Sequence, residues 1–571
     1  MMLESRSRIR LFSIFILCFA LLLVGKLYMV QIVNADVYAG KANRQYVQSN
    51  YDYFDRGSIF FQNKDGGLVP AATLKSGFIL AINPKLVLDV EGTFEKIQAI
   101  HPIDKDVFFA KAKKKTSSYE EIAKRFPIEK SDELTAEKLP GVSLYQQRWR
   151  FYPGNSMAAQ TVGFVAYDDS GESLTGRYGL ERYYQDTLKR NNDAVFVNFF
   201  AEIFSNINNA LSSDTALEGD VVTTIEPSVQ AMLEQVVVDA QKTWSSDETA
   251  GIVMDPMTGA IYAMATVPTF DLNDFQSEKS TGVYANHMVE RVYEMGSIIK
   301  PITMAVALDT GAVTRQSVYN DTGQIRVNSR TISNYDGKAR GVVSVQEILN
   351  QSLNVGSAWV QQRIGNDTFA KYMMDFGFGS ETGIDLPNET HGLVNNLKSP
   401  RDVEYITASF GQGVAYTPIE TVRALAALGN GGKLVNPHIA SQINHKIGGS
   451  KKIDLGVEKQ VLKPETSTEI TQMLVNVVDK ALRGGEVKME HYSIAAKTGT
   501  AQISKGSGGG YYDDRYLHSF FGYFPAYNPR FIVFLYTVHP KEVKYASETL
   551  TDPFINMAKF LINYYQIPPD R

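Results

Sequence analysis

The sequence predicts an α+β protein: an antiparallel sheet flanked by helices in the C-terminal part, on an N-terminal mixed α/β domain with one membrane helix. Two apolar segments, residues 250–255 and 260–265, share the turn sequence 256–259, Pro-Met-Thr-Gly, which indicates a hairpin of the sheet. A third apolar segment, residues 530–538, precedes a helical stretch ending near Tyr565, which adds a strand and a flanking helix. The 571 residues allow several domains at about 150 residues each.

The N-terminus carries a predicted transmembrane anchor, residues 11–33. This run is apolar apart from Lys26 near its outer end, and it is long enough for a bilayer core that needs about 20 residues. Residues 1–10 contain three arginines, so they form the predicted cytoplasmic tail, and the rest of the chain is expected outside. A cleaved signal peptide is the alternative, with residues 33–35, Val-Asn-Ala, as a weak cleavage site; the length of the run favours an anchor.

Residues 34–225 alternate between strand-like and helix-like segments and contain no catalytic pattern. Residues 78–82 are predicted to form a buried strand, and residues 106–126 a helix whose lysines make a solvated face. A surface for anionic polymer or lipid is the less favoured interpretation of those lysines. Residues 191–213 form an extra segment rich in asparagine and phenylalanine, to which the sequence assigns no role.

Composition and missing motifs exclude several classes of function. The 57 basic and 62 acidic residues give a net charge of −5, which argues against nucleic-acid binding. Cys18 is the only cysteine, so the chain cannot form an internal disulfide or a cysteine-rich zinc site. The eight histidines contain no His-Glu-x-x-His pattern, and residues 429–433 lack the earlier glycine of a phosphate-binding loop. No metal and no cofactor are therefore expected.

Residues 226–571 contain a serine and a lysine in the spacing of a nucleophile and its base. Ser297 and Lys300 would lie on one face of a helix, with Cβ atoms about 5 to 6 Å apart. Gly296 is compatible with a tight entry into this helix, whose N-terminal amides would face the reacting oxygen. The amine can accept a proton only if burial or a nearby cation lowers its pKa. Taken alone, this motif also fits a solvated helix.

Two further motifs follow in a fixed order, Ser352-Leu353-Asn354 and then Lys497-Thr498-Gly499-Thr500. The three motifs together resemble the signature of penicillin-binding proteins and serine β-lactamases. Their order matters, because Lys75-Ser76-Gly77 also matches the third motif but precedes the serine. Near the serine, Met295 and residues 298–299 (Ile-Ile) replace residues that are common in class B members, and neither change removes a reactive group.

Fragments outside the three motifs resemble class B penicillin-binding proteins. Residues 56–60, 150–154 and 176–181 are similar to landmarks of the non-catalytic pedestal (dimerisation-like) domain of that class. The resemblance implies a pedestal over residues 34–225. It implies a transpeptidase domain of the penicillin-binding and serine β-lactamase-like fold over residues 226–571.

The resemblance also implies acyl transfer by Ser297. Lys300 would be the base, with its pKa lowered by burial and by Lys497, although which group takes the first proton is left open. Ser352 would relay the proton to the departing D-alanine. Asn354 would orient Lys300 and the amide of the substrate.

The third motif is assigned to substrate binding by the same resemblance. Lys497, Thr498 and Thr500 would bind the terminal carboxylate of a D-Ala-D-Ala stem peptide. Gly499 would let the bound peptide approach the backbone of its strand closely. The backbone amides of Ser297 and Thr500 would form the oxyanion hole, a contribution of about 3 to 4 kcal/mol per donor.

A class B member cross-links peptidoglycan by transferring the acyl group to an amine of a neighbouring stem peptide, and β-lactams acylate it. A septal role in division is favoured over the elongation role of the same class. A D,D-carboxypeptidase or β-lactamase on the same fold and an inactive binding scaffold are further alternatives. Expected partners are lipid-linked glycan strands, a SEDS-family glycosyltransferase, and other division or elongation membrane proteins. The expected location is the bacterial cytoplasmic membrane, with the catalytic domain on its periplasmic or outer face.

Overall fold

A computed structural model describes residues 54–190, 218–446, 449–506 and 509–571, with three single positions before residue 54. The predicted anchor, apart from those positions, and the segment 191–213 lie outside the described residues. Within the described part, no helix is long and apolar enough to cross a bilayer. This part divides into two compact units: residues 75–149 form the smaller one, and residues 55–74 with 150–571 form the larger.

The smaller unit packs three helices and three strands around one apolar core. β3 and β4 both pair with β2, whose second half belongs to this unit and includes the predicted buried strand at 78–82. Leu80, Ile97, Phe108 and Phe126 lie in the core. The elements are β2 (Leu68–Ile82), α3 (Val90–Ile100), α4 (Lys105–Ala112), β3 (Glu120–Phe126), α5 (Ser131–Ala136) and β4 (Val142–Phe151).

The predicted helix over residues 106–126 is wrong in its second half. α4 ends at Ala112, and residues 120–126 form β3, which is antiparallel to β2. Ile122 and Phe126 are buried by this pairing, so tertiary contacts decide a segment whose local pattern also fits a helix. The Lys115 amine donates to the carbonyls of Pro84 and Val87 at 2.7 and 2.9 Å, which ties the turn after α4 to the unit.

The first sheet of the larger unit has the strand order β16, β15, β7, β1 and the first half of β2. β1 and β7 are parallel, and the other neighbours are antiparallel. Short helices and a two-stranded ribbon follow β4 in the chain. The elements are β1 (Ile59–Gln62), α6 (Ala159–Val162), β5 (Val165–Tyr167), β6 (Leu174–Gly176), α7 (Gly179–Tyr183), α8 (Gln185–Leu188), β7 (Gly219–Thr223), β15 (Ala440–His445) and β16 (Ser450–Lys452).

Three landmarks that are distant in the sequence meet at the buried carboxylate of Glu181. This carboxylate and the side chains of Arg56 and Arg150 form what we call the arginine–glutamate triad. The Glu181 carboxylate accepts from Arg56 Nε at 2.6 Å and from Arg150 Nε at 2.5 Å. Arg56 Nη2 also donates to the Glu181 carbonyl at 2.7 Å, and Arg150 Nη1 to the Gly57 carbonyl at 2.8 Å. The two arginines are 3% and 7% exposed and the glutamate 0%. The triad therefore joins all three pedestal landmarks.

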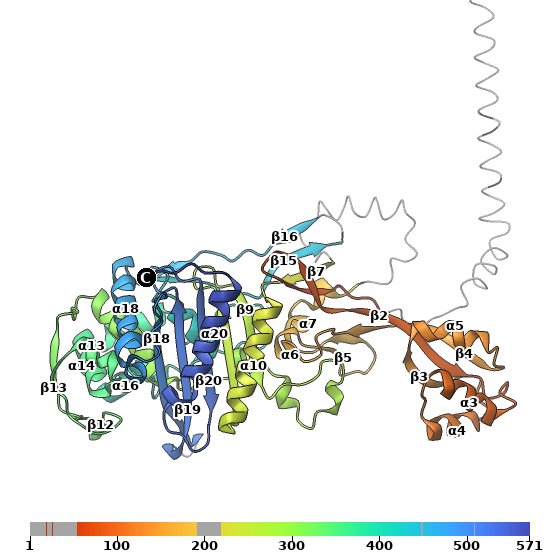
Figure 1. Cartoon of the computed structure of the whole chain (residues 1–571), viewed down its shortest axis with the longest axis horizontal. Coiled ribbons are helices and arrows are strands. Elements are labelled where there is room, and N and C mark those ends of the chain that lie inside the picture. Colours follow the sequence, from red (N-terminus) through yellow and green to blue (C-terminus); the bar gives the residue numbers. More distant parts are fainter. Residues whose placement is uncertain are drawn as a thin grey trace, which may run out of the picture. The chain divides into compact units, whose positions relative to one another are not determined.

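The second sheet of the larger unit has five antiparallel strands in the order β18, β19, β20, β8, β9. The predicted hairpin is β8 and β9, and the predicted strand at 530–538 is β20, so both predictions are confirmed. Helices α10 and α20 cover one face of these strands (Figure 1) and bury Leu233 and Phe554 against them. The elements are α10 (Pro227–Trp244), β8 (Glu248–Met254), β9 (Ile261–Val267), β18 (Ala495–Ser504), β19 (Tyr511–Phe524), β20 (Phe531–Val538) and α20 (Thr551–Tyr564).

The opposite side of this sheet packs against a mainly helical layer, and Ile298, Ile302 and Phe521 lie in the shared core. The layer begins with α11 (His287–Glu290), η6 (Gly296–Ile299) and α12 (Lys300–Asp309). Two ribbons follow, made of β10 (Val318–Asp321), β13 (Gly341–Ser344), β11 (Gln324–Val327) and β12 (Arg330–Ser333). Its other helices are α13 (Val345–Asn350), α14 (Asn354–Ile364), α15 (Asn366–Asp375), α16 (Asp402–Ala408), α17 (Pro418–Ala426) and α18 (Pro464–Asn476).

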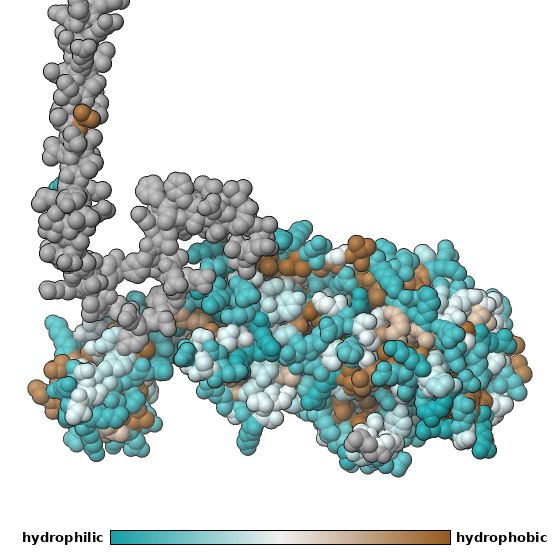
Figure 2. All heavy atoms as spheres, turned by 180° about the vertical axis from the view of Figure 1, so that it is seen from behind, coloured by the Kyte–Doolittle hydropathy of each residue, from teal (hydrophilic) through white to brown (hydrophobic). Residues whose placement is uncertain are grey.

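Hydrophilic residues cover most of the face drawn in Figure 2. Figure 2 shows one face, on which apolar residues gather in small groups among hydrophilic ones. Large apolar side chains such as Phe369, Phe376 and Phe524 are fully buried instead. Other large apolar side chains, such as Leu88, Val342 and Val457, are exposed singly.

Candidate active site

Ser297 lies in a 3₁₀ turn that leads directly into a helix. η6 ends at Ile299, and α12 begins at Lys300. Gly296 has a φ of +66°, and a Cβ there would lie 2.8 Å from the Thr500 carbonyl oxygen, so this entry requires glycine. Side chains three apart eclipse each other in a 3₁₀ turn. Accordingly the Lys300 Nζ lies 2.9 Å from Ser297 Oγ.

The Lys300 amine is enclosed by oxygen atoms. Its side chain is buried, with the residue 1% exposed, and Nζ donates to the Ser352 carbonyl at 2.6 Å and to Asn354 Oδ1 at 2.8 Å. Burial, and then the charge of Lys497, hold the pKa of this amine well below its usual range. A neutral amine has two N–H groups and one lone pair, and carbonyl oxygens can only accept. In its neutral form the two protons of this amine would go to the carbonyl oxygens of Ser352 and Asn354, and the lone pair would be left for the hydroxyl proton of Ser297.

Ser352 adopts a backbone conformation that is uncommon for a residue with a side chain. Its φ is +53°, in the left-handed region. This conformation accompanies a double contact with Lys300, whose Nζ lies 2.6 Å from the Ser352 carbonyl and 3.2 Å from its Oγ. Backbone strain of this kind costs about 1 to 3 kcal/mol and persists where the surroundings hold it. The motif in the sequence predicts the hydroxyl contact but carries no signal for the carbonyl.

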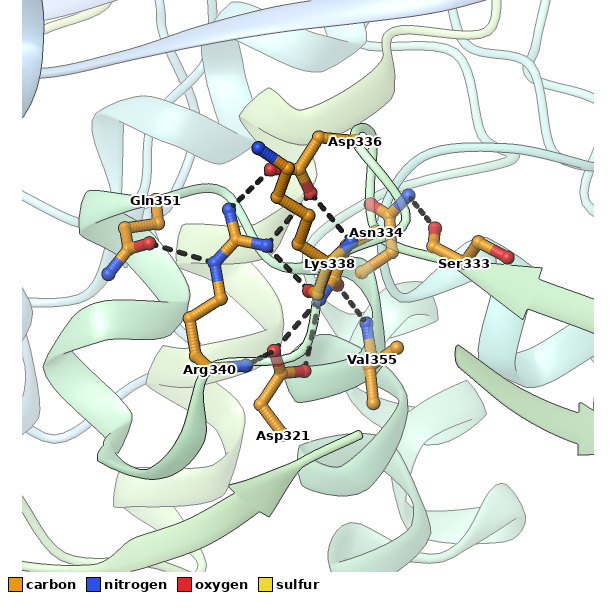
Figure 3. Close-up of polar contacts among 9 residues, drawn as sticks. Asp321, Ser333, Asn334, Asp336, Lys338, Arg340, Gln351 and Val355 are labelled. Carbon is orange, nitrogen blue, oxygen red and sulfur yellow. Dashed lines mark hydrogen bonds and ion pairs between the residues drawn. The ribbon is translucent and has the colours of Figure 1, made fainter. Parts of the chain in front are cut away.

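A polar network holds the second motif from behind. Figure 3 shows Asn334 between Asp321 and Val355: its Nδ2 lies 3.0 Å from each Asp321 oxygen, and its Oδ1 accepts the Val355 N–H at 3.1 Å. The Ser333 carbonyl accepts from Asn354 Nδ2 at 3.0 Å, which fixes the amide with its oxygen toward Lys300. No motif in the sequence marks this network, because Asp321, Ser333 and Asn334 lie in or beside short strands that become neighbours of the second motif only on folding.

Arg340 completes the same network on the other side of the motif. Its Nε donates to Gln351 Oε1 at 3.1 Å, and its Nη1 and Nη2 contact the two Asp336 oxygens at 2.8 and 2.9 Å (Figure 3). Gln351 directly precedes Ser352. The loop between β12 and β13 is thus bound to both ends of the segment that surrounds the Lys300 amine.

Lys497 reaches the same centre from β18, an edge strand of the five-stranded sheet. Its Nζ lies 3.1 Å from Ser352 Oγ and 3.0 Å from the Thr498 carbonyl, and the residue is 3% exposed. Burial lowers the pKa of this amine to about 7. Ser352 Oγ therefore lies between two lysine amines, in the position of a proton relay.

Packing inside the protein gives a further reason for glycine at position 499. A Cβ at this position would lie 2.4 Å from Ser519 Oγ, 2.7 Å from the Met295 carbonyl oxygen and 3.0 Å from Ile298 Cγ2. These atoms belong to the protein interior, so the missing side chain lets η6 pack onto β18. The expectation that this glycine also lets a bound peptide approach the backbone stays a prediction.

The predicted residues come together at one cleft with a volume of about 770 Å³. Six of them line it: Ser297, Ser352, Asn354, Lys497, Thr498 and Thr500. Lys300 is in contact with Ser297 without lining the cleft, and Gly499 is part of β18 between the lining residues Thr498 and Thr500. Thr500 Oγ1 accepts the Ala546 N–H at 3.1 Å, which leaves the hydroxyl proton of Thr500 free to donate into the cleft.

Glu294 and Tyr511 form a further contact that the sequence analysis did not use. The Tyr511 hydroxyl lies 3.0 Å from both carboxylate oxygens of Glu294, and burial raises the pKa of that carboxyl to about 7. The contact ties the start of β19 to the segment before Ser297. It therefore fixes the nucleophile relative to the sheet.

Comparison with known families agrees with this arrangement over both parts of the chain. The family described as penicillin binding protein transpeptidase domain matches residues 249–558. The family described as penicillin-binding protein dimerisation domain matches residues 54–224. The chain belongs to the class B penicillin-binding proteins. As a member it is a penicillin-sensitive serine D,D-transpeptidase of cell-wall synthesis. The boundary between residues 225 and 226 stays a prediction.

Individual relatives of this class B protein span most of its length. Stage V sporulation protein D of Bacillus subtilis is 31% identical over 508 residues, 88% of this chain and 77% of the relative. Peptidoglycan D,D-transpeptidase FtsI of Buchnera aphidicola subsp. Baizongia pistaciae is 25% identical, with 99% and 96% covered. The fold resembles penicillin binding protein 3 of Mycobacterium tuberculosis, solved with aztreonam, at a TM-score of 0.68 and 22% identity, covering 90% of this chain and 97% of that one.

Proposed function

We propose that this chain cross-links peptidoglycan at the division septum by serine acyl transfer, and that β-lactams acylate the same serine. The donor would be a D-Ala-D-Ala stem peptide, and the acceptor an amine of a neighbouring stem peptide. One observation carries the assignment of the reacting group: a buried lysine amine whose protons are engaged by two carbonyl oxygens lies 2.9 Å from Ser297 Oγ.

In the first half-reaction Ser297 Oγ forms a bond to the carbonyl carbon of the penultimate D-alanine. The Ser297 proton passes to the lone pair of Lys300. The carbonyl oxygen becomes an oxyanion, which the backbone N–H groups of Ser297 and Thr500 stabilise. When the amide bond breaks, the departing D-alanine nitrogen takes a proton through Ser352, whose Oγ lies 3.2 Å from Lys300 Nζ. The product is an ester between Ser297 and the donor.

The terminal carboxylate of the donor binds at β18. Lys497 supplies a positive charge, and the hydroxyls of Thr498 and Thr500 donate hydrogen bonds. Thr500 is suited to this role because its oxygen is already held by the Ala546 N–H. The same three groups would bind the carboxylate of a penicillin.

In the second half-reaction the acceptor amine attacks the ester carbonyl. The amine loses a proton to Lys300, either directly or through Ser352. The bond between the carbonyl carbon and Ser297 Oγ breaks, and the Ser297 oxygen regains a proton from Lys300. A new amide bond joins the two stem peptides, and the enzyme returns to its starting state.

The septal role is supported by the relatives named FtsI. A role in sporulation is a second candidate, favoured by the similarity to stage V sporulation protein D. For either role we propose that residues 11–33 anchor the chain in the bacterial cytoplasmic membrane with its catalytic domain outside. A SEDS-family glycosyltransferase would supply the glycan strands. Depletion of the protein in its own host, followed by microscopy of septa and spores, separates the two roles.

Covalent labelling with fluorescent penicillin tests the chemistry. We expect the full-length protein in detergent to form a stable adduct, and Ser297→Ala to form none. Ser409→Ala, which removes a buried hydroxyl outside the cleft, is the control that should still label. Rapid loss of the label with release of hydrolysed drug would indicate a hydrolase on the same fold. No label on folded wild-type protein would contradict the proposal.

The rate of acylation should fall as the pH rises through about 7. Because burial lowers the pKa of Lys497 to about 7, its amine loses its positive charge above that pH, and with it the attraction for the ligand carboxylate. The second-order rate constant for benzylpenicillin reports the free enzyme, so it should decline by up to about tenfold per pH unit. Lys497→Arg, which stays protonated, should not show this decline. A rate that rises through pH 7 in the wild type would contradict the assignment.

A further inference from the structure

The walls of the cleft are cationic and carry no opposing charge. Four basic side chains line it: Arg330, Arg483, Lys497 and Lys544. None of the described residues that line it is an aspartate or a glutamate. A cleft with one sign of charge concentrates ligands of the other sign. The cleft is therefore built for an anionic ligand.

Two of these cations have no assigned task. Lys497 belongs to the proposed site for the terminal carboxylate. Arg483 is held by the protein itself, since its Nη1 and Nη2 contact the Asp552 carboxylate at 2.7 and 3.1 Å and its Nε donates to the Ser547 carbonyl at 3.1 Å. Arg330 and Lys544 are exposed, and neither forms an ion pair with a carboxylate in the described part of the chain. These two are the unpaired cations of the cleft.

Lys544 sits at a fixed place beside the third motif. Its backbone carbonyl bonds to Nε2 of the buried His518 at 3.0 Å, and two residues later the Ala546 N–H donates to Thr500 Oγ1 at 3.1 Å. The segment from Lys544 to Ala546 is thus attached to β19 at one end and to β18 at the other. Its charge is presented next to the residues that would bind the terminal carboxylate.

Arg330 lines the same cleft from the start of β12. The same strand ends at Ser333, whose carbonyl holds Asn354, so Arg330 lies about 10 Å along the strand from that contact. Two tyrosines that line the cleft, Tyr335 after β12 and Tyr545 next to Lys544, have ring centroids 5.8 Å apart. Both cations line the cleft that contains Ser297.

We propose that this transpeptidase selects stem peptides with a free carboxylate in addition to that of the terminal D-alanine, and that Arg330 and Lys544 bind this second carboxylate. The inference rests on the proposed function and adds a substrate class to it. A guanidinium matches a carboxylate with two parallel hydrogen bonds, and an amidated stem peptide offers no charge to either cation. Stem peptides whose internal carboxylates are amidated would be the poorer substrates.

The test compares benzylpenicillin with carbenicillin, which differ by one side-chain carboxylate. The ratio of the two acylation rate constants, carbenicillin over benzylpenicillin, is measured on the full-length protein in detergent. We expect Arg330→Gln and Lys544→Gln each to lower this ratio about three- to fivefold, the effect of one partly exposed ion pair, and salt to lower it in the wild type. Arg326→Gln is the matched control, because Arg326 is exposed in the same β11–β12 ribbon but does not line the cleft.

A second measurement uses stem peptides themselves. Two pentapeptides ending in D-Ala-D-Ala, which differ only in whether the glutamyl α-carboxyl is free or amidated, compete with fluorescent penicillin for the wild type and both variants. Stronger protection by the free carboxylate in the wild type, reduced in the variants, supports the inference. Equal protection by both peptides, together with a penicillin ratio that neither variant changes, overturns it while leaving acyl transfer intact. A wild type that no penicillin labels would overturn the proposed function and this inference with it.

Discussion

Lys300→Met is expected to slow acylation of Ser297 by about three to four orders of magnitude, the upper range for loss of a general base. Methionine keeps most of the length of the side chain but offers no lone pair for the serine proton and no N–H for Ser352 and Asn354. The rate is measured as the second-order constant for fluorescent penicillin. The buried oxygens of Ser352 and Asn354 lose a donor, so some stability should be lost, and a melting curve of the same sample shows whether the variant is still folded when labelling is measured.

Two companion variants sharpen this experiment. Lys300→Arg retains a cation that cannot accept a proton at neutral pH, so it should be as slow as the methionine variant. Lys371→Met removes an exposed lysine that pairs with Asp375 on α15, and it should label at the wild-type rate. If Lys300→Met were labelled at more than about a tenth of the wild-type rate, another group, such as Lys497 acting through Ser352, would be the base.

Glu181→Gln is expected to reduce the stability of the larger unit by about 3 to 5 kcal/mol. The substitution keeps the shape of the side chain but leaves Arg56 and Arg150 buried without a counter-charge. A buried charge without a partner is among the most costly defects in a protein interior. The melting temperature of the full-length protein should therefore drop by several degrees.

Two controls distinguish the triad from a general effect of removing a carboxylate. Glu278→Gln changes an exposed glutamate of the same unit and should alter stability by no more than about 0.5 kcal/mol. A variant with apolar residues at all three triad positions should lose less than Glu181→Gln, since no charge is then stranded. A Glu181→Gln protein as stable as the wild type would show that water or a neighbouring group compensates the arginines.

The sequence predicted the class of the C-terminal part from local patterns. The apolar segments around residues 256–259 have the length and the turn residues of a hairpin, and they form β8 and β9. The pattern at residues 106–126 predicted one helix, and its second half was wrong, because a short segment with scattered apolar residues fits a helix and a strand equally well. Residues 120–126 form a strand because they pair with β2, whose partner residues are 38 or more positions away along the chain.

The three motifs, in their order and through their resemblance to those of penicillin-binding proteins, predicted that Ser297, Lys300 and Lys497 belong to one site. Only the tertiary structure decided how the Lys300 protons are engaged, why Gly499 must be glycine, and which cations are left unpaired in the cleft. The Ser352 carbonyl, the Ser333 and Asn334 contacts and the pair of Tyr335 and Tyr545 depend on backbone atoms and loop ends brought together by folding. Backbone groups are present at every position, so a sequence carries no mark of the ones that a fold will use.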